Sequence, residues 1–189
     1  MESLVALASQ TDLRPVPLPS GREAKIRALC VQFARATPDR LKPGLLAPTY
    51  TSKPLVSVDG DAMFGELAIV RWLEKDGWEG VWVDTFHGQK FWRVMPHKSS
   101  PVVLPPPVQA RYDAVKAANG GRASGFFDVM AWRGEQIIHL EYKGSGDLSN
   151  RNEAAWIEAA LAAGVPEFDL WFVLHPKSRS MRRATVAAV

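Results

Sequence analysis

The chain of 189 residues has little of what defines several specialised protein classes. It holds one cysteine, Cys30, and four widely separated histidines, so the sequence predicts neither an internal disulfide nor a zinc cluster. It has no apolar run of membrane-spanning length, no basic start typical of a signal peptide and no internal repeat. We therefore expect a soluble, intracellular, cytoplasmic protein in a reducing compartment.

What the chain does have fits one globular domain with a buried core. Apolar residues make up 47% of it and charged residues 23%, with a net charge of +3. No acidic residue occurs from 171 to 189, where the basic residues are Lys177, Arg179, Arg182 and Arg183. A basic tail over 177–189 suggests contacts with nucleic-acid phosphates, although a solvated, frayed terminus fits the charge equally well.

Proline divides the chain into parts. Residues 1–57 carry two proline-rich stretches around a predicted helix over 21–36, and we expect an N-terminal arm or small helical subdomain there. The core is predicted over 58–176, with an insertion over 95–124. The proline-rich start of that insertion cannot lie in a helix or an inner strand, because proline lacks the required N–H.

Within the core the pattern alternates between helices and strands. Apolar spacing predicts helices over 62–76, 108–118 and 150–163, and a hairpin with strands over 80–86 and 91–94. Glu66 shares a helix face with Val70 and Leu73. It is either a partly exposed residue at the edge of the apolar stripe or a functional carboxylate.

A second hairpin carries the residues of greatest chemical interest. If Trp132 pairs with Ile137, Met130 lies opposite His139 and Asp128 lies opposite Glu141. The alternation places six apolar residues on one face: Phe127, Val129, Ala131, Ile138, Leu140 and Tyr142. Asp128, Glu141 and Lys143 share the other face.

Two opposed carboxylates about 5 Å apart repel each other by roughly 3 kcal/mol at an effective dielectric near 20. A hard divalent cation such as Mg²⁺ or Mn²⁺ would relieve this repulsion. A solvent-facing hairpin, on which Lys143 pairs with both acids, explains the same residues without a metal. Glu153 is similarly ambiguous: with Asn150 as N-cap it occupies position N3, where it can cap the helix, yet it also faces the sheet near Lys143.

In order, these residues resemble the PD-(D/E)XK nuclease superfamily, and within it the VRR-NUC domain. The resemblance covers about 50 residues and rests on Gly125, Asp128, Glu141, Lys143, Gly144, Asp147, Glu153 and Trp156. The predicted helix with Glu66 and the strand that follows resemble the start of that fold. Phe127 stands where the family often has proline, and Glu153 where VRR-NUC domains usually carry glutamine.

The resemblance implies an α/β, restriction-endonuclease-like fold, in which a mixed central β-sheet is flanked by helices. It also implies a Mg²⁺- or Mn²⁺-dependent endodeoxyribonuclease, structure-specific cleavage being one form of that activity. Asp128, Glu141 and the backbone carbonyl of Tyr142 would hold the metal, Lys143 would orient or activate the nucleophile, and Glu66 and Glu153 would be supporting or second-metal ligands.

Other functions stay open at this point. A catalytically idle nuclease fold that binds nucleic acid or protein, or a hydrolase directed at RNA or nucleotides, would fit the same scaffold. DNA, branched or single-stranded, is the expected partner. A homodimer, or a protein partner bound through residues 1–57, is also compatible with the sequence.

Overall fold

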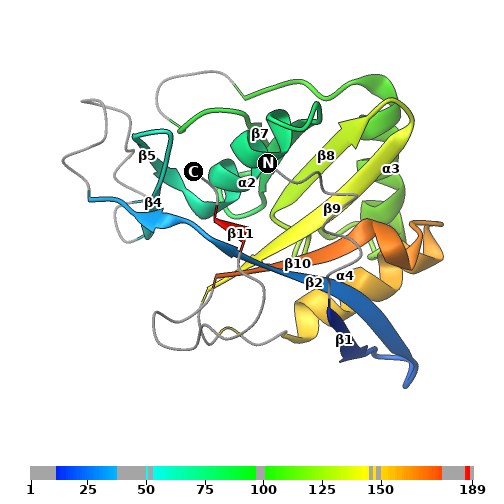
Figure 1. Ribbon diagram of the computed structural model, residues 1–189. Coiled ribbons are helices and arrows are strands. Elements are labelled where there is room, and N and C mark those ends of the chain that lie inside the picture. Colours follow the sequence, from blue (N-terminus) through cyan, green and yellow to red (C-terminus); the bar gives the residue numbers. More distant parts are fainter. Residues whose placement is uncertain are drawn as a thin grey trace.

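The computed structural model shows a mixed α/β protein built around one large β-sheet (Figure 1). The structure describes residues 12–37, 50, 53–96, 101–144, 147, 150–175 and 186–187. The α-helices of this part are α2 (Gly65–Glu74), α3 (Pro106–Ala118) and α4 (Arg151–Ala162). None of these described helices has both the length and the apolar character that a membrane crossing needs.

Seven strands follow one another across the central sheet in the order β1, β2, β10, β9, β8, β6, β7. β10 runs parallel to both of its neighbours, whereas the other pairs on this path are antiparallel, so the sheet is mixed. The strands are β1 (Asp12–Pro17), β2 (Glu23–Gln32), β6 (Glu79–Asp84), β7 (Lys90–Trp92), β8 (Val129–Arg133), β9 (Gln136–Lys143) and β10 (Leu170–Leu174). A further short strand, β11 (Val186–Ala187), pairs in parallel with β2.

Helices cover both faces of this sheet (Figure 1). α2 packs on one face, and α3 and α4 pack on the other, which gives two separate buried clusters. Alternation along β10 supplies both, because Trp171 and Val173 join the α2 cluster while Leu170 and Phe172 join the other. The inner strands are therefore apolar on both faces.

A small antiparallel sheet lies on the α2 side. Its strands are β3 (Ala34–Arg35), β4 (Leu55–Val58) and β5 (Asp61–Phe64). β5 leads directly into α2, and residues of β4 and β5 are buried in the same cluster as that helix. The first turn of α2 is thus fixed between the small sheet and the central sheet.

Most predicted elements of the core are confirmed. The helices expected over 62–76, 108–118 and 150–163 correspond to α2, α3 and α4, and the first hairpin corresponds to β6 and β7. The expectation that the proline-rich start of the insertion lies outside any helix is wrong at Pro106 and Pro107. They open α3, where the first turn needs no N–H donor. The expectation of an α/β protein with a mixed central sheet flanked by helices is also confirmed.

The helix predicted over 21–36 is wrong. These residues form the strand β2 and the short strand β3, and β2 lies between β1 and β10. Because β2 contributes to both buried clusters, residues 12–32 belong to the central sheet and do not form a helical subdomain. The rest of the stretch 1–57 falls largely outside the described residues.

Candidate active site

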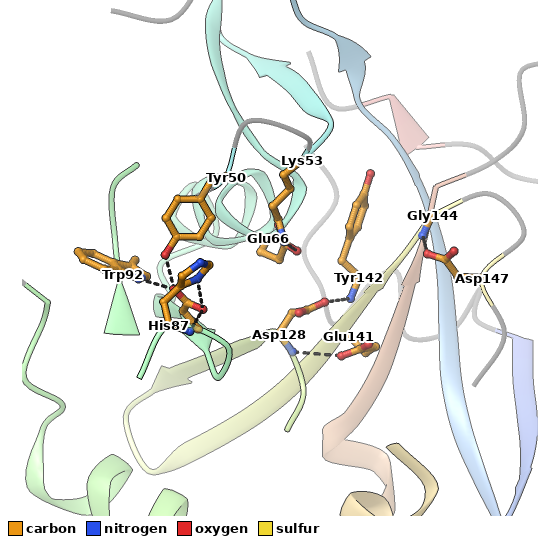
Figure 2. Close-up of polar contacts among 11 residues, drawn as sticks. Tyr50, Lys53, Glu66, His87, Trp92, Asp128, Glu141, Tyr142, Gly144 and Asp147 are labelled. Carbon is orange, nitrogen blue, oxygen red and sulfur yellow. Dashed lines mark hydrogen bonds and ion pairs between the residues drawn. The ribbon is translucent and has the colours of Figure 1, made fainter. Parts of the chain in front are cut away.

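The β8–β9 hairpin brings two carboxylates together where β8 begins. Its register is the predicted one, with Trp132 opposite Ile137 and Met130 opposite His139. One step beyond the last ladder pair, the backbone N–H of Asp128 donates to Glu141 Oε2 at 3.2 Å (Figure 2). Asp128 and Glu141 are therefore neighbours, as the sequence predicted.

One detail of the predicted alternation is wrong. Phe127 does not share the apolar face of Val129 but packs in the opposite cluster, where its ring stacks on Trp156 with centroids 4.4 Å apart. The regular strand begins only at Val129, so the alternation of faces does not extend back to Phe127. At this irregular position, Asp128 Oδ2 accepts a hydrogen bond from the backbone N–H of Tyr142 at 3.1 Å.

The surroundings of this pair disfavour negative charge. Burial, followed by repulsion from Glu66, raises the pKa of Asp128 to about 8. Burial and repulsion from Asp128 also raise the pKa of Glu141 well above its usual value. Two carboxyl groups with raised pKa values next to each other form a site where a cation would be stabilised.

Lys143 lies on the same side as Glu141 and joins it to α4. Its Nζ is 3.3 Å from Glu141 Oε1 and 2.5 Å from Glu153 Oε1, and all three side chains are buried. Burial opposes the charge of Lys143, but Glu141 and Glu153 outweigh it and raise the lysine pKa. The alternative of a solvent-facing hairpin is thereby excluded for Glu141 and Lys143.

Glu153 serves the helix and the lysine together. The Asn150 side chain accepts from the N–H of Glu153 at 3.1 Å, and Glu153 Oε2 accepts from the N–H of Asn150 at 3.4 Å, which forms the predicted capping box. The other carboxylate oxygen pairs with Lys143. Cap and ion pair were alternatives in the sequence, whereas in the structure one carboxylate does both.

Gly125 allows α4 to approach the hairpin. It has φ +79°, and a Cβ there would lie 2.2 Å from the carbonyl oxygen of Asn152. Only glycine combines this backbone conformation with such a close contact. Gly144, the other glycine of the motif, donates its N–H to Asp147 Oδ2 at 2.8 Å.

Glu66 is buried at the start of α2, with 4% of its surface exposed. Its Oε1 lies 2.6 Å from Lys53 Nζ, and its Oε2 has no hydrogen-bond partner in the described part of the chain (Figure 2). Glu66 also acts electrostatically on Asp128. The idea that Glu66 is a partly exposed residue at the edge of a stripe is therefore wrong.

Sequence reasoning missed a buried cluster beside the site. Asp84, at the end of β6, accepts hydrogen bonds from the Tyr50 hydroxyl, the backbone and ring of His87, and the Trp92 indole at 3.2 Å (Figure 2). These hydrogen bonds outweigh the effect of burial and lower the pKa of Asp84. The sequence shows only an acidic residue at the end of an apolar strand, and this pattern does not indicate which side chains contact it.

Lys53, also missed, connects this cluster with Glu66. Its ammonium group lies 4.9 Å from the centre of the Trp82 ring and 5.6 Å from that of Phe64. The negative charges of Glu66, Asp128 and Asp84 raise its pKa against the opposing effect of burial. Lys53 follows a proline-rich stretch without periodicity, so no pattern could place it here.

The oxygen donors fit Mg²⁺ or Mn²⁺ better than other ions. Mg²⁺ commonly takes one or two protein carboxylates and keeps several waters, and Asp128 and Glu141 are such a pair. Among the described residues, no group of three or more His, Cys, Asp or Glu side chains is arranged to hold a metal. Any metal here would therefore depend on the two carboxylates, a backbone oxygen and water.

The basic residues predicted to bind nucleic acid lie outside the described part of the chain. These are Lys177, Arg179, Arg182 and Arg183. Comparisons with models of protein families, with curated proteins and with solved structures gave no match for this chain.

Proposed function

We propose that this protein hydrolyses phosphodiester bonds in DNA with the help of Mg²⁺ or Mn²⁺. The observation that supports this most directly is the group formed by half-buried Asp128 with buried Glu141 and Lys143, held against α4 by Glu153. Hydrolysis of a phosphodiester is accelerated by a cation close to the phosphate, a positioned water and a positive charge that offsets the developing negative charge. The group supplies a place for each.

The order of elements supports a restriction-endonuclease-like fold. A helix with a buried acid (α2) precedes the strand β6. Then come Asp128 directly before β8, β9 with Glu141 and Lys143, α4 with Glu153, and β10. This is the order that the sequence resemblance implies. In this proposal β7 and α3 between β6 and β8 are additions to that core.

The residues would divide the work as follows. Asp128, Glu141 and the backbone carbonyl of Tyr142 would hold the metal, with Glu66 as a supporting carboxylate. When bound, the metal polarises a phosphoryl oxygen and lowers the pKa of its water. Lys143 remains protonated between its two carboxylates and orients the attacking water or offsets phosphate charge. The water oxygen bonds to phosphorus and gives up a proton to bulk water, while the P–O ester bond breaks and the leaving oxygen takes a proton from bulk water.

A panel of branched, duplex and single-stranded DNA and RNA, each with Mg²⁺, Mn²⁺ or EDTA, tests this proposal. We expect metal-dependent cleavage of at least one DNA by the wild type and loss of cleavage in Lys143→Ala. Lys25→Ala is a matched control, because Lys25 is exposed on β2 in the same sheet. Equal cleavage by wild type and Lys143→Ala would contradict the assigned role.

The same panel separates the rival functions. Cleavage of RNA alone would identify an RNA-directed hydrolase on this scaffold. Tight binding without cleavage under all metal conditions would identify a binding module. Either result would overturn the proposed activity, and the melting temperature of each variant shows whether its fold is intact.

A further inference from the structure

A pocket of about 600 Å³ opens beside the candidate active site, on the α2 side of β9. It lies between the small sheet, the first turn of α2 and the ends of β9 and β10. The residues that matter for its chemistry are Arg35, Lys53, Glu66, Tyr142 and His175. Its size is within the range of pockets that enclose small ligands, roughly 300 to 1,000 Å³.

We propose that this pocket holds a nucleotide of a single-stranded nucleic acid next to the bond to be cut. The proposal rests on the proposed function and names the form of its substrate. One or two nucleotides are comparable in size with the pocket, whereas a stacked duplex presents its bases only through grooves and does not fit inside it.

Tyr142 is the surface for a base. It is half-buried, lines the pocket and follows Glu141 directly in β9. Its ring lies against Gly65, where a Cβ would come within 2.4 Å of a ring carbon, so the glycine leaves the ring its space. Aromatic side chains of this kind bind single strands by stacking, because every base has a π-face.

The backbone of Tyr142 ties this surface to the acidic pair. Its N–H donates to Asp128 Oδ2 at 3.1 Å, while its side chain reaches the pocket (Figure 2). A base stacked on this ring would therefore place its phosphate close to the Asp128 and Glu141 carboxylates. This adjacency distinguishes the pocket from a general surface hollow.

Basic side chains of the pocket lining suit a phosphate. Arg35 is exposed on β3, and Lys53 carries an ammonium group at the pocket wall. His175 Nδ1, which is buried, has no hydrogen-bond partner within the described residues. The acidic lining residues already have partners, since Glu66 pairs with Lys53 and Asp147 accepts from Gly144.

Binding of a labelled single-stranded DNA, an RNA of the same sequence and the DNA duplex in EDTA tests the proposal. No metal-dependent cleavage occurs in EDTA, so the result does not depend on hydrolysis. We expect the single strands to bind more tightly than the duplex. We also expect roughly tenfold weaker single-strand binding in Tyr142→Leu and near wild-type binding in Tyr142→Phe, because only the former lacks the ring.

Two matched controls carry comparable side chains far from the pocket. Phe168→Leu removes an exposed ring within η3 (Glu167–Asp169), which precedes β10. Arg133→Gln removes an exposed charge at the β8–β9 turn and is the control for Arg35→Gln. Arg35→Gln should reduce the salt dependence of single-strand binding by about one phosphate contact. Neither control should change single-strand preference.

A single strand with 2-aminopurine in place of one base gives a second readout, which needs no substitution in the protein. Its fluorescence should be quenched on binding if the base stacks on a ring, and this quenching should persist in Tyr142→Phe. Equal binding of duplex and single strand, or unchanged binding in Tyr142→Leu, would overturn the assignment of the pocket but would not contradict the proposed hydrolysis. Single-strand binding without any cleavage in metal would instead overturn the proposed hydrolysis alone.

Discussion

Asp128 and Glu141 are carboxyl groups in surroundings that disfavour their charge. Both pKa values are raised, chiefly by burial, and Lys143 pairs with Glu141 and not with Asp128. In the absence of metal, the burial of Asp128 therefore lowers the free energy of unfolding at any pH at which this carboxyl is ionised in the unfolded chain. The same group would release its proton when a cation binds, so metal affinity should rise with pH up to about 8.

Asp128→Asn should change how stability depends on pH in EDTA. The folded pKa is about 8 and the unfolded value about 4, so the folded wild type binds more protons between these limits and loses stability as pH rises. The variant lacks this group. The free energy of unfolding of the variant minus that of the wild type should therefore increase by roughly 1 kcal/mol for each pH unit from pH 4 to 8.

Chemical denaturation of both proteins across this pH range measures the difference. His139 is buried with its pKa lowered to about 3, and it gives a slope of opposite sign below its usual pKa of about 6.5. This contribution is common to both proteins, so the readout is the difference between them and not the slope of either. A constant difference from pH 4 to 8 would contradict the raised pKa.

The sequence predicted the group of residues around the β8–β9 hairpin but not the residues next to that group. Strand alternation and the capping rule are local, and they sufficed to bring Asp128, Glu141, Lys143 and Glu153 together. The pairs of Lys53 with Glu66 and of Tyr50 with Asp84 depend on tertiary contacts that no periodic pattern in the sequence indicates.

Among the elements, α4 determines the geometry of the site through its first turn. Gly125→Ala should destabilise the protein by about 2 to 5 kcal/mol, because it combines a strained left-handed backbone with a contact against α4. Gly164→Ala is the matched control: it has the same φ of +79° but nothing within 4 Å, so only the backbone strain applies. Thermal unfolding of both variants gives the comparison. Equal losses would show that the close approach of α4 carries no energetic weight.

Glu153 allows the two roles of the α4 N-terminus to be separated. Glu153→Gln can keep the capping box but loses the charge that faces Lys143, so we expect near wild-type stability and a reduced cleavage rate. Glu153→Ala should also lose about 0.5 to 2 kcal/mol of stability. Turnover per folded molecule and melting temperature are the measurements. Wild-type turnover in both variants would limit Glu153 to the helix cap.

The failed prediction of a helix over 21–36 has a physical cause. Residues of β2 are apolar at Ala24, Ile26 and Ala28 on one face and at Leu29 and Val31 on the other. A strand buried on both faces lacks clean alternation, and its alanines and charged residues favour a helix locally. Pairing with β1 and with β10, a strand distant in the sequence, overrides that preference.

For the whole molecule, the candidate site is a product of topology. Glu66 comes from α2, Glu141 from β9, Asp128 from the position directly before β8, and Glu153 from α4 on the opposite face. The ends of these inner strands therefore gather residues from both sides of the sheet. The α/β class and the order of elements from α2 to α4 were predictable because they follow from local patterns. The small sheet and its pocket were not, because β3 and β4 meet across a proline-rich stretch.

The proposal that Asp128 and Glu141 hold a divalent cation is tested most directly by melting curves at pH 8. Wild type, Asp128→Asn and, as an exposed control, Asp113→Asn are compared in EDTA and in excess Mn²⁺. We expect Asp128→Asn to melt above wild type in EDTA, by about 2 to 4 °C for each kcal/mol of relieved repulsion. Mn²⁺ should stabilise wild type and Asp113→Asn but not Asp128→Asn. An Asp128→Asn protein that is less stable than wild type in EDTA, with the same response to Mn²⁺, would contradict the claim.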